Sequence, residues 1–287
     1  MIANLATPTP YDGAMYPVPT SMSPSRVESF TSCPLAFRFS SIQKLPEPPS
    51  IHMTRGSFVH RVLELLFMAP PVQRTTDRAD SCLQQATLEY QSNPEFTQLN
   101  LTDAAHAKFF ADSRVLLASY FRMEDPTTVR DIGLELRLEA QVGDLTLRGI
   151  IDRLDLDNDG RLVVTDYKTG RAPGLQYEQG RLAGVHFYSF LCESLFGQRP
   201  AAIRLMYLST GETITATPSA QSTKFITTRT TAVWKAVEKS CITGDFKPRQ
   251  GPFCGTCSFQ TWCPAFGGDP ALAETEVPIR LASLVGV

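Results

Sequence analysis

The segment that decides the fold is IIDRLDLDNDGRLVVTDYKTG, residues 150–170, which holds five aspartates and one lysine around an Asp-Asn-Asp-Gly turn. Four of its residues match the opening of a calcium-binding EF-hand loop: Asp155, Asp157, Asp159 and Gly160. An EF-hand loop must lie between two helices, whereas alternating and β-branched residues flank this turn on both sides. Asn-Asp and Asp-Gly pairs are common in hairpin turns, because these turns need positive φ. The segment therefore predicts a β-hairpin that turns near Asp159.

Two aspartates of this hairpin are predicted to face each other. A turn centred on Asp159 sets Asp152 opposite Asp166 on the paired strands. Opposed residues have Cβ atoms about 4.5–5.5 Å apart, so two carboxylates there repel each other unless a cation lies between them. Lys168 follows Asp166 by two residues and falls on the same face of the strand. The alternative is a surface hairpin whose charges are solvated, which is the ordinary pattern of antiparallel sheets.

The composition of the chain sets broad limits on its class. Its 287 residues are 43% apolar and can bury the core of one large domain. The net charge of −2 gives no global signal for nucleic acid, so a polyanionic partner would need a local basic patch. No stretch approaches the roughly 18 apolar residues of a membrane helix, and no signal peptide is recognisable. We expect a cytoplasmic protein without membrane contact, whose seven cysteines are thiols or metal ligands.

Periodicity predicts helices before and after a run of strands. We expect a flexible tail over 1–24, one domain over 25–266 and a C-terminal tail without regular structure over 267–287. The first helix begins near Ser25, with Pro34 as an interruption. Further helices are expected over 53–68, 78–91, 102–123, 175–197 and 223–244, and strands over 133–141, 145–156, 161–168 and 201–210.

The hairpin also carries a family resemblance. GIIDRLD, residues 149–155, and VVTDYKTG, residues 163–170, resemble the second and third motifs of the PD-(D/E)xK nucleases of the RecB type. GSFVHRVLE, residues 56–64, resembles the Gly-xxx-His helix of that family, with His60 as its histidine. The resemblance covers about residues 25–266. It implies an α/β restriction-endonuclease-like core, with a mixed central sheet flanked by helices, helical insertions and a C-terminal cysteine segment.

The helix after the lysine strand matches the family only in part. Tyr188 in HFYSFL is similar to the motif tyrosine. Where the family usually has glutamine, four residues earlier, this chain has Gly184. Gln179 and His186 lie on the same predicted helix and are the candidates to replace that glutamine.

The resemblance implies a metal site and an activity. His60, Asp152, Asp166 and the backbone carbonyl of Tyr167 would hold Mg²⁺ or Mn²⁺, and Lys168 would position or help to deprotonate the attacking water. Glu64, one turn after His60, either orients the metal site or is a solvated helix residue. The implied function is DNA hydrolysis by an exonuclease-like enzyme acting on single strands or ends, in repair, recombination or a related pathway. The alternative is a catalytically silent DNA-binding or scaffolding subunit of a helicase-nuclease complex.

The cysteine spacing suggests a second metal centre. Cys254, Cys257 and Cys263 form a C-x2-C-x5-C pattern, and Cys33 lies far upstream. This set is similar to the iron-sulfur staple of AddB-type and CRISPR-associated RecB-like nucleases, in which four such cysteines bind a [4Fe-4S] cluster. Zinc is the alternative, because it also accepts four thiolates. The other three cysteines fall at apolar positions of predicted helices and are expected in the core: Cys82, Cys192 and Cys241.

Overall fold

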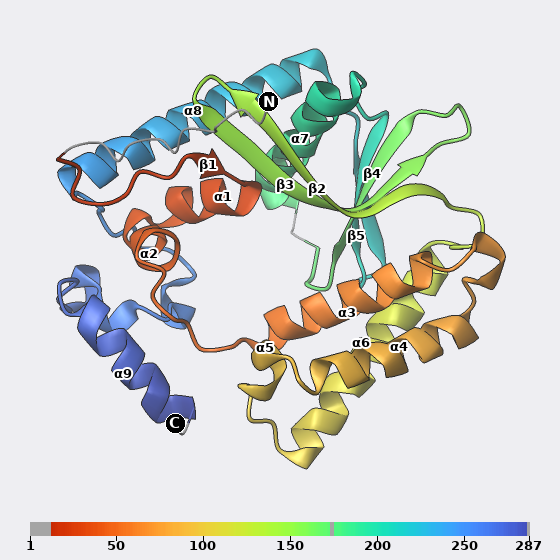
Figure 1. Ribbon diagram of the computed structural model, residues 1–287, viewed down its shortest axis with the longest axis horizontal. Helices are drawn as coiled ribbons and strands as arrows, with labels where there is room; N and C mark the ends of the chain where they lie inside the picture. The colour runs from red at the N-terminus through yellow and green to blue at the C-terminus, as the bar shows by residue number, and fades with distance from the viewer. Residues whose placement is uncertain (1–12, 173–174, 286–287) are drawn as a thin grey trace, which may run out of the picture. The chain divides into compact units, whose positions relative to one another are not determined.

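The computed structural model describes residues 13–172 and 175–285, and Figure 1 traces their course. Its α-helices are α1 (Pro24–Ser32), α2 (Pro34–Phe37), α3 (Ile51–Phe67), α4 (Thr76–Tyr90), α5 (Pro94–Thr97), α6 (Asp103–Met123), α7 (Leu175–Phe196), α8 (Ala220–Thr243) and α9 (Ala273–Val285). Its strands are β1 (Ser21–Met22), β2 (Arg130–Val142), β3 (Leu145–Leu156), β4 (Leu162–Lys168), β5 (Ala202–Tyr207) and β6 (Glu212–Ala216). Short 3-10 or π segments are η1 (Arg38–Ile42), η2 (Pro71–Gln73), η3 (Cys254–Thr256), η4 (Gln260–Trp262) and η5 (Pro264–Phe266). Within the described ranges, no helix has the length and apolarity needed to cross a membrane.

The chain divides into two compact units. The hairpin unit comprises Pro49–Ala140 and Arg148–Ile226. The cysteine unit comprises the described residues within Met1–Pro48, Gln141–Leu147 and Thr227–Val287. The predicted tail boundary at residue 24 is not a boundary of either unit, and the first 12 residues of that tail lie outside the described part of the chain.

The central sheet is mixed, as the sequence predicts. Its strand order is β1-β3-β4-β5-β6, with β2 paired against β3. β3 and β4 are antiparallel, and their register runs from Arg153 opposite Thr165 to Leu156 opposite Leu162. The same register extended by one residue sets Asp152 opposite Asp166, in agreement with the predicted hairpin. β5 lies parallel to β4, and β6 returns antiparallel to β5.

The aspartates of the hairpin turn pair with backbone N–H groups and an arginine. The Asp157 carboxylate accepts hydrogen bonds from the backbone N–H groups of Asp159 and Arg161. The Arg161 guanidinium lies 2.8 Å from Asp157 and 2.9 Å from Asp159, so an arginine neutralises the carboxylates that would bind a calcium ion. Gly160 has a φ of +76°, the left-handed conformation that the turn prediction requires.

Helices α3, α4 and α6 share a hydrophobic core in the hairpin unit, and Figure 1 shows them together. Serine or threonine side chains cap all three N-termini: Ser50, Thr75 and Thr102. Phe58 on α3 is fully buried and meets the rings of Tyr90, Phe109 and Phe110 edge-on at 5.1–5.6 Å between centroids. Cys82 is buried in this core, and Cys192 and Cys241 are also buried, which confirms their prediction as core residues.

The cysteine unit contains elements that the sequence did not predict. β1 lies in the predicted tail and pairs in parallel with the start of β3. α9 lies where no element is expected, with Pro278 inside it. Tertiary contacts hold this helix in place: Ala273 and Val277 are buried, and the Trp262 indole N–H donates to Glu276 at 2.8 Å. Patterning alone does not reveal such a helix.

Candidate active site

The hairpin unit brings α3 against the end of β4. A Cβ atom at Gly56 would lie 3.2 Å from the Thr169 hydroxyl, closer than side chains ordinarily approach. Glycine at this position therefore lets the helix pass close to the strand. One turn later, His60 reaches Tyr167, and its Nε2 lies 2.9 Å from the Tyr167 carbonyl oxygen.

The predicted site residues gather around Tyr167. The Tyr167 N–H donates to Asp152 Oδ2 at 2.7 Å, and His60 Nδ1 lies 3.6 Å from the same oxygen. On either side of Tyr167 in β4, Lys168 Nζ lies 2.6 Å from Asp166 Oδ2. Asp166 is 4% exposed, and this oxygen accepts no other hydrogen bond from the described residues. The structure thus brings together four of the predicted side chains: His60, Asp152, Asp166 and Lys168.

Burial and the charged groups of the site shift the pKa values of its side chains. Burial opposes the charged form of His60, but the carboxylates of Asp152 and Asp166 outweigh it and raise the pKa of His60 to about 9. Burial would raise the pKa of Asp152, but the interaction with His60 lowers it below its usual value. The pKa of Asp166 is raised by burial, against the opposing effect of Lys168. The two opposed carboxyl groups therefore differ in proton affinity.

Glu135 is a member of the site that the sequence analysis missed. One nitrogen of His60 and one carboxylate oxygen each of Glu135 and Asp152 all lie within 4.8 Å of one another. Burial, together with the charge of Asp152, raises the pKa of Glu135 to about 7. Asp166 is not part of this trio, and its carboxylate pairs with Lys168. Nitrogen and carboxylate donors at this spacing suit Mg²⁺ or Mn²⁺, and this chemistry fits the metals implied by the family resemblance.

A local irregularity of β2 turns Glu135 toward the site. Its φ is +46°, a left-handed conformation that is strained in a non-glycine residue. Two residues earlier, a Cβ at Gly133 would lie 2.4 Å from Leu136 Cδ1, so a larger residue there would force the Leu136 side chain to shift. The strand predicted over 133–141 gave Glu135 no role in the site. The signal that could have found it is the glycine inside a strand pattern.

The remaining predicted side chains are placed less centrally. Tyr188 is half-buried over Gly149, where an added Cβ would lie 3.1 Å from its ring. Its pKa is raised well above the usual range by burial and by the carboxylates of Asp166 and Asp152, so the phenol lies near them. Glu64 pairs with Arg61 at 2.7 Å rather than with His60.

The position of the missing glutamine is only partly accounted for. Gly184 is half-buried on α7. His186, two residues on, has a buried Nδ1 without a hydrogen-bond partner among the described residues. The Gln179 side chain lies outside the described part of the structure.

The four predicted cluster cysteines converge within the cysteine unit. Cys33 occupies the extended junction between α1 and α2, and the other three lie in or beside the short turns η3, η4 and η5. The pKa of Cys257 is raised by burial and then by the charges of Cys33, Cys254 and Cys263, which shows that the sulfurs are neighbours. Backbone N–H groups point at two of them, from Arg249 to Cys33 Sγ at 3.5 Å and from Gly251 to Cys254 Sγ at 3.3 Å.

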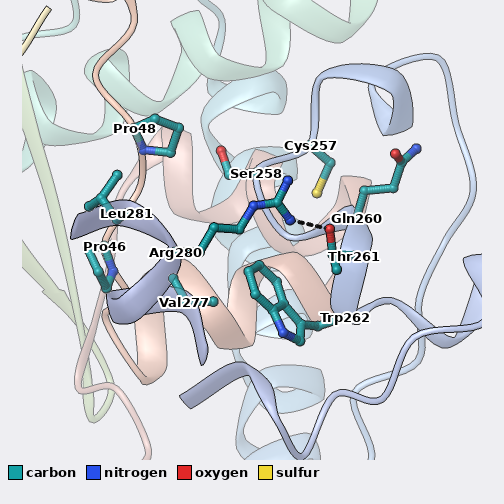
Figure 2. A pocket seen from close by; sticks show the side chains of 10 residues that line it. All are labelled: Pro46, Pro48, Cys257, Ser258, Gln260, Thr261, Trp262, Val277, Arg280 and Leu281. Carbon is teal, nitrogen blue, oxygen red and sulfur yellow. Dashed lines mark hydrogen bonds between the residues drawn. The ribbon is translucent and has the colours of Figure 1, made fainter. Parts of the chain in front are cut away.

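A cavity of about 200 Å³ adjoins this cysteine set. Figure 2 shows Cys257 on its wall, with Trp262 and Arg280 nearby and Pro46 across from them. The Arg280 guanidinium donates to the Thr261 hydroxyl and lies over the Trp262 ring. The Cys257 thiol is therefore reachable through this cavity.

The sequence matches the model of the PD-(D/E)XK nuclease superfamily over residues 21–264. The chain belongs to this superfamily, and its mixed sheet flanked by helices is the fold that the family resemblance implies. A protein of Eubacterium rectale, whose assignment as an exonuclease is provisional, has a crystal structure that aligns with a TM-score of 0.52. The alignment covers 83% of this chain and 87% of the Eubacterium rectale chain at 12% identity, so it supports a similarity of fold alone.

Curated relatives fall into two groups. An ATP-dependent helicase/deoxyribonuclease subunit of Streptococcus equi subsp. zooepidemicus strain H70 is 27% identical over 53% of this chain, but the match spans only 14% of that protein. The Gene 69 protein of Mycobacterium phage L5 is 29% identical over 46% of this chain and 44% of its own length. The Gene 69 protein of Mycobacterium phage D29 is 23% identical, with coverage of 85% of this chain and 96% of its own length.

Proposed function

We propose that this protein is a divalent-metal-dependent deoxyribonuclease that acts as an exonuclease on single-stranded DNA or DNA ends. The observation that carries the proposal is the partly buried cluster of opposed carboxylates and one histidine on the β3-β4 hairpin and α3. Two carboxylates at opposed strand positions repel each other, and a divalent cation offsets that repulsion. Such a site on a nuclease fold favours a role in phosphodiester hydrolysis over the alternative of a surface hairpin whose charges are only solvated.

Each side chain has a proposed role. His60, Glu135, Asp152, Asp166 and the Tyr167 carbonyl would hold Mg²⁺ or Mn²⁺, which supplies positive charge at the phosphate and lowers the pKa of a bound water. Lys168, held by Asp166, would orient the attacking water. Tyr188 lies near the same carboxylates and would contact the phosphate group.

We also propose that the four cysteines hold a [4Fe-4S] cluster. Among the described residues, His60, Glu135 and Asp152 are the one set of three histidine, cysteine or carboxylate ligand atoms that lie within 4.8 Å of one another. No three of the described cysteine sulfurs are therefore as close together as that. Tetrahedral zinc, with Zn–S bonds of about 2.3 Å, needs a tighter set of thiolates. The wider spacing favours the cluster over zinc. Stoichiometric iron and sulfide with a broad visible absorbance would support it, and one zinc per chain without iron would contradict it.

A helicase partner is a further part of the proposal. The streptococcal relatives are named as helicase/deoxyribonuclease subunits, and the chain covers a small part of them. These 287 residues contain no Gly-x4-Gly-Lys-Ser/Thr nucleotide-binding motif, so they would not themselves supply unwinding, and a helicase is the proposed partner in a cytoplasmic repair or recombination complex. The second candidate function is that of a silent DNA-binding subunit, and the presence of Asp152, Asp166 and Lys168 together argues against it.

The substrate form is tested with anaerobically purified protein and labelled DNA. Linear single strands, linear duplexes and circular single strands are incubated with Mn²⁺, Mg²⁺ or EDTA. We expect metal-dependent release of short products from linear single strands and none from circles. Cleavage of circles would replace the exonuclease by an endonuclease, and DNA binding without cleavage under any metal would favour the silent subunit.

A further inference from the structure

Behind the candidate site, on the other face of the sheet, lies a buried arginine. Arg153 directly follows Asp152, and its side chain is fully buried. Its guanidinium binds two carboxylates through paired hydrogen bonds, at 2.7 and 3.0 Å to Asp155 and at 2.7 and 2.9 Å to Glu124. Its central carbon also lies 4.4 Å from the centre of the Phe67 ring. The guanidinium is therefore held in one orientation from several sides.

The same guanidinium holds Tyr167. Arg153 Nη1 donates to the Tyr167 hydroxyl at 2.6 Å, and the phenol ring is buried edge-on against Tyr120 at 5.8 Å. The backbone of Tyr167 faces the site, where its N–H binds Asp152 and its carbonyl binds His60. Tyr167 thus joins the buried arginine on one face of the sheet to the candidate site on the other.

We infer that Arg153 is a positioning residue, which fixes the Tyr167 backbone, and with it Asp152 and His60, by anchoring the Tyr167 phenol. This inference rests on the proposed function, since the Tyr167 carbonyl is one of the proposed metal ligands. Buried ion pairs are frequently replaceable by apolar groups without loss of stability, so charge neutralisation alone gives a weak reason for this cluster. Groups that orient metal ligands typically affect metal affinity or activity by roughly ten- to one-hundredfold.

Two tyrosine substitutions separate positioning from a structural role. Tyr167→Phe removes only the hydroxyl that Arg153 holds. Tyr120→Phe is the matched control, because the Tyr120 hydroxyl donates to Glu124 at 2.9 Å and lies 3.4 Å from Arg153 Nη1, whereas its backbone carbonyl accepts the N–H of Glu124. Both changes remove one buried hydroxyl from the same cluster.

The readouts are the Mn²⁺ dissociation constant of the DNA-free protein by calorimetry, and kcat and KM for labelled single-stranded DNA. We expect Tyr167→Phe to weaken Mn²⁺ binding and lower kcat by about tenfold with KM unchanged, while Tyr120→Phe stays within about twofold of wild type. Arg153→Lys should retain less than half of the wild-type activity, because the lysine ammonium cannot hold three partners in one plane as a guanidinium does.

Three results would overturn the inference. Wild-type Mn²⁺ affinity and kcat in Tyr167→Phe would contradict the positioning role of Arg153 and leave the nuclease assignment intact. Equal losses in both tyrosine variants would reduce the cluster to a structural role. A wild-type protein that neither binds Mn²⁺ nor cuts DNA would overturn the proposed function and this inference together.

Discussion

At the residue scale, Glu135 is the least expected member of the site. We expect Glu135→Gln to weaken Mn²⁺ affinity and DNA cleavage by roughly ten- to one-hundredfold, because an amide oxygen is a poorer ligand than a carboxylate. Glu139→Gln on the same strand is the control, since its exposed carboxylate lies 3.5 Å from the exposed Arg148. Equal cleavage by Glu135→Gln and Glu139→Gln would remove Glu135 from the ligand set.

The buried cysteines give a second prediction at this scale. Burial raises the pKa of Cys192 to about 12 and that of Cys241 to about 11, so both stay protonated at about pH 8. After removal of bound metal, iodoacetamide should label the half-buried Cys33 and Cys254 long before Cys192 and Cys241. Mass spectrometry of timed samples measures the order, and rapid labelling of Cys192 would show that its core opens readily.

Individual residues differ in how far the sequence predicts them. Asp152, Asp166 and Lys168 were predictable because a tight turn fixes the hairpin register and the two-residue period fixes the face. Glu135 was not, because its orientation depends on one left-handed residue inside a strand, and alternation assumes that no such residue exists. The ion pair between Glu64 and Arg61 is instead local, because the two residues lie three positions apart on α3.

At the element scale, the approach of α3 to β4 positions His60. Gly56→Ala adds a methyl 3.2 Å from the Thr169 hydroxyl and should push the helix away by a few tenths of an ångström. Alanine favours a helix by about 1 kcal/mol over glycine, so the melting temperature should hold while cleavage falls. The double variant Gly56→Ala/Thr169→Ala should recover activity, because the clashing oxygen is gone. Full activity in Gly56→Ala alone would show that the close approach is not needed.

Elements with their own sequence signals were predicted well. α3, α4 and α6 each combine a capping residue with a broad apolar stripe, and all three were expected. β6 was missed because it is short, although its partner β5 is its neighbour in the chain. α9 was missed because it contains Pro278 and is held in part by a residue distant in the chain, Gln43, which donates to Glu274. Pro34 was expected to interrupt the first helix, and the structure places Cys33 at that break.

At the scale of the whole molecule, the cysteine set joins the first helices to the C-terminal turns. Cys257→Ser should lose bound iron and lower the melting temperature, because a cluster closes a loop of more than two hundred residues. Cys192→Ala is the control, since it removes a buried thiol outside the set and should keep the wild-type iron content. Unchanged iron content in Cys257→Ser would contradict the proposed ligand set.

The most direct test of the central claim is the single-turnover rate at which Asp166→Asn cuts end-labelled single-stranded DNA with Mn²⁺. Asp159→Asn is measured beside it, because Asp159 carries the same charge on the same hairpin but is exposed in the turn. We predict that Asp166→Asn loses at least about a hundredfold in rate, as expected for loss of a metal-site carboxylate, and that Asp159→Asn cuts like wild type. Cleavage by Asp166→Asn at the wild-type rate would contradict the account and place any nuclease activity elsewhere.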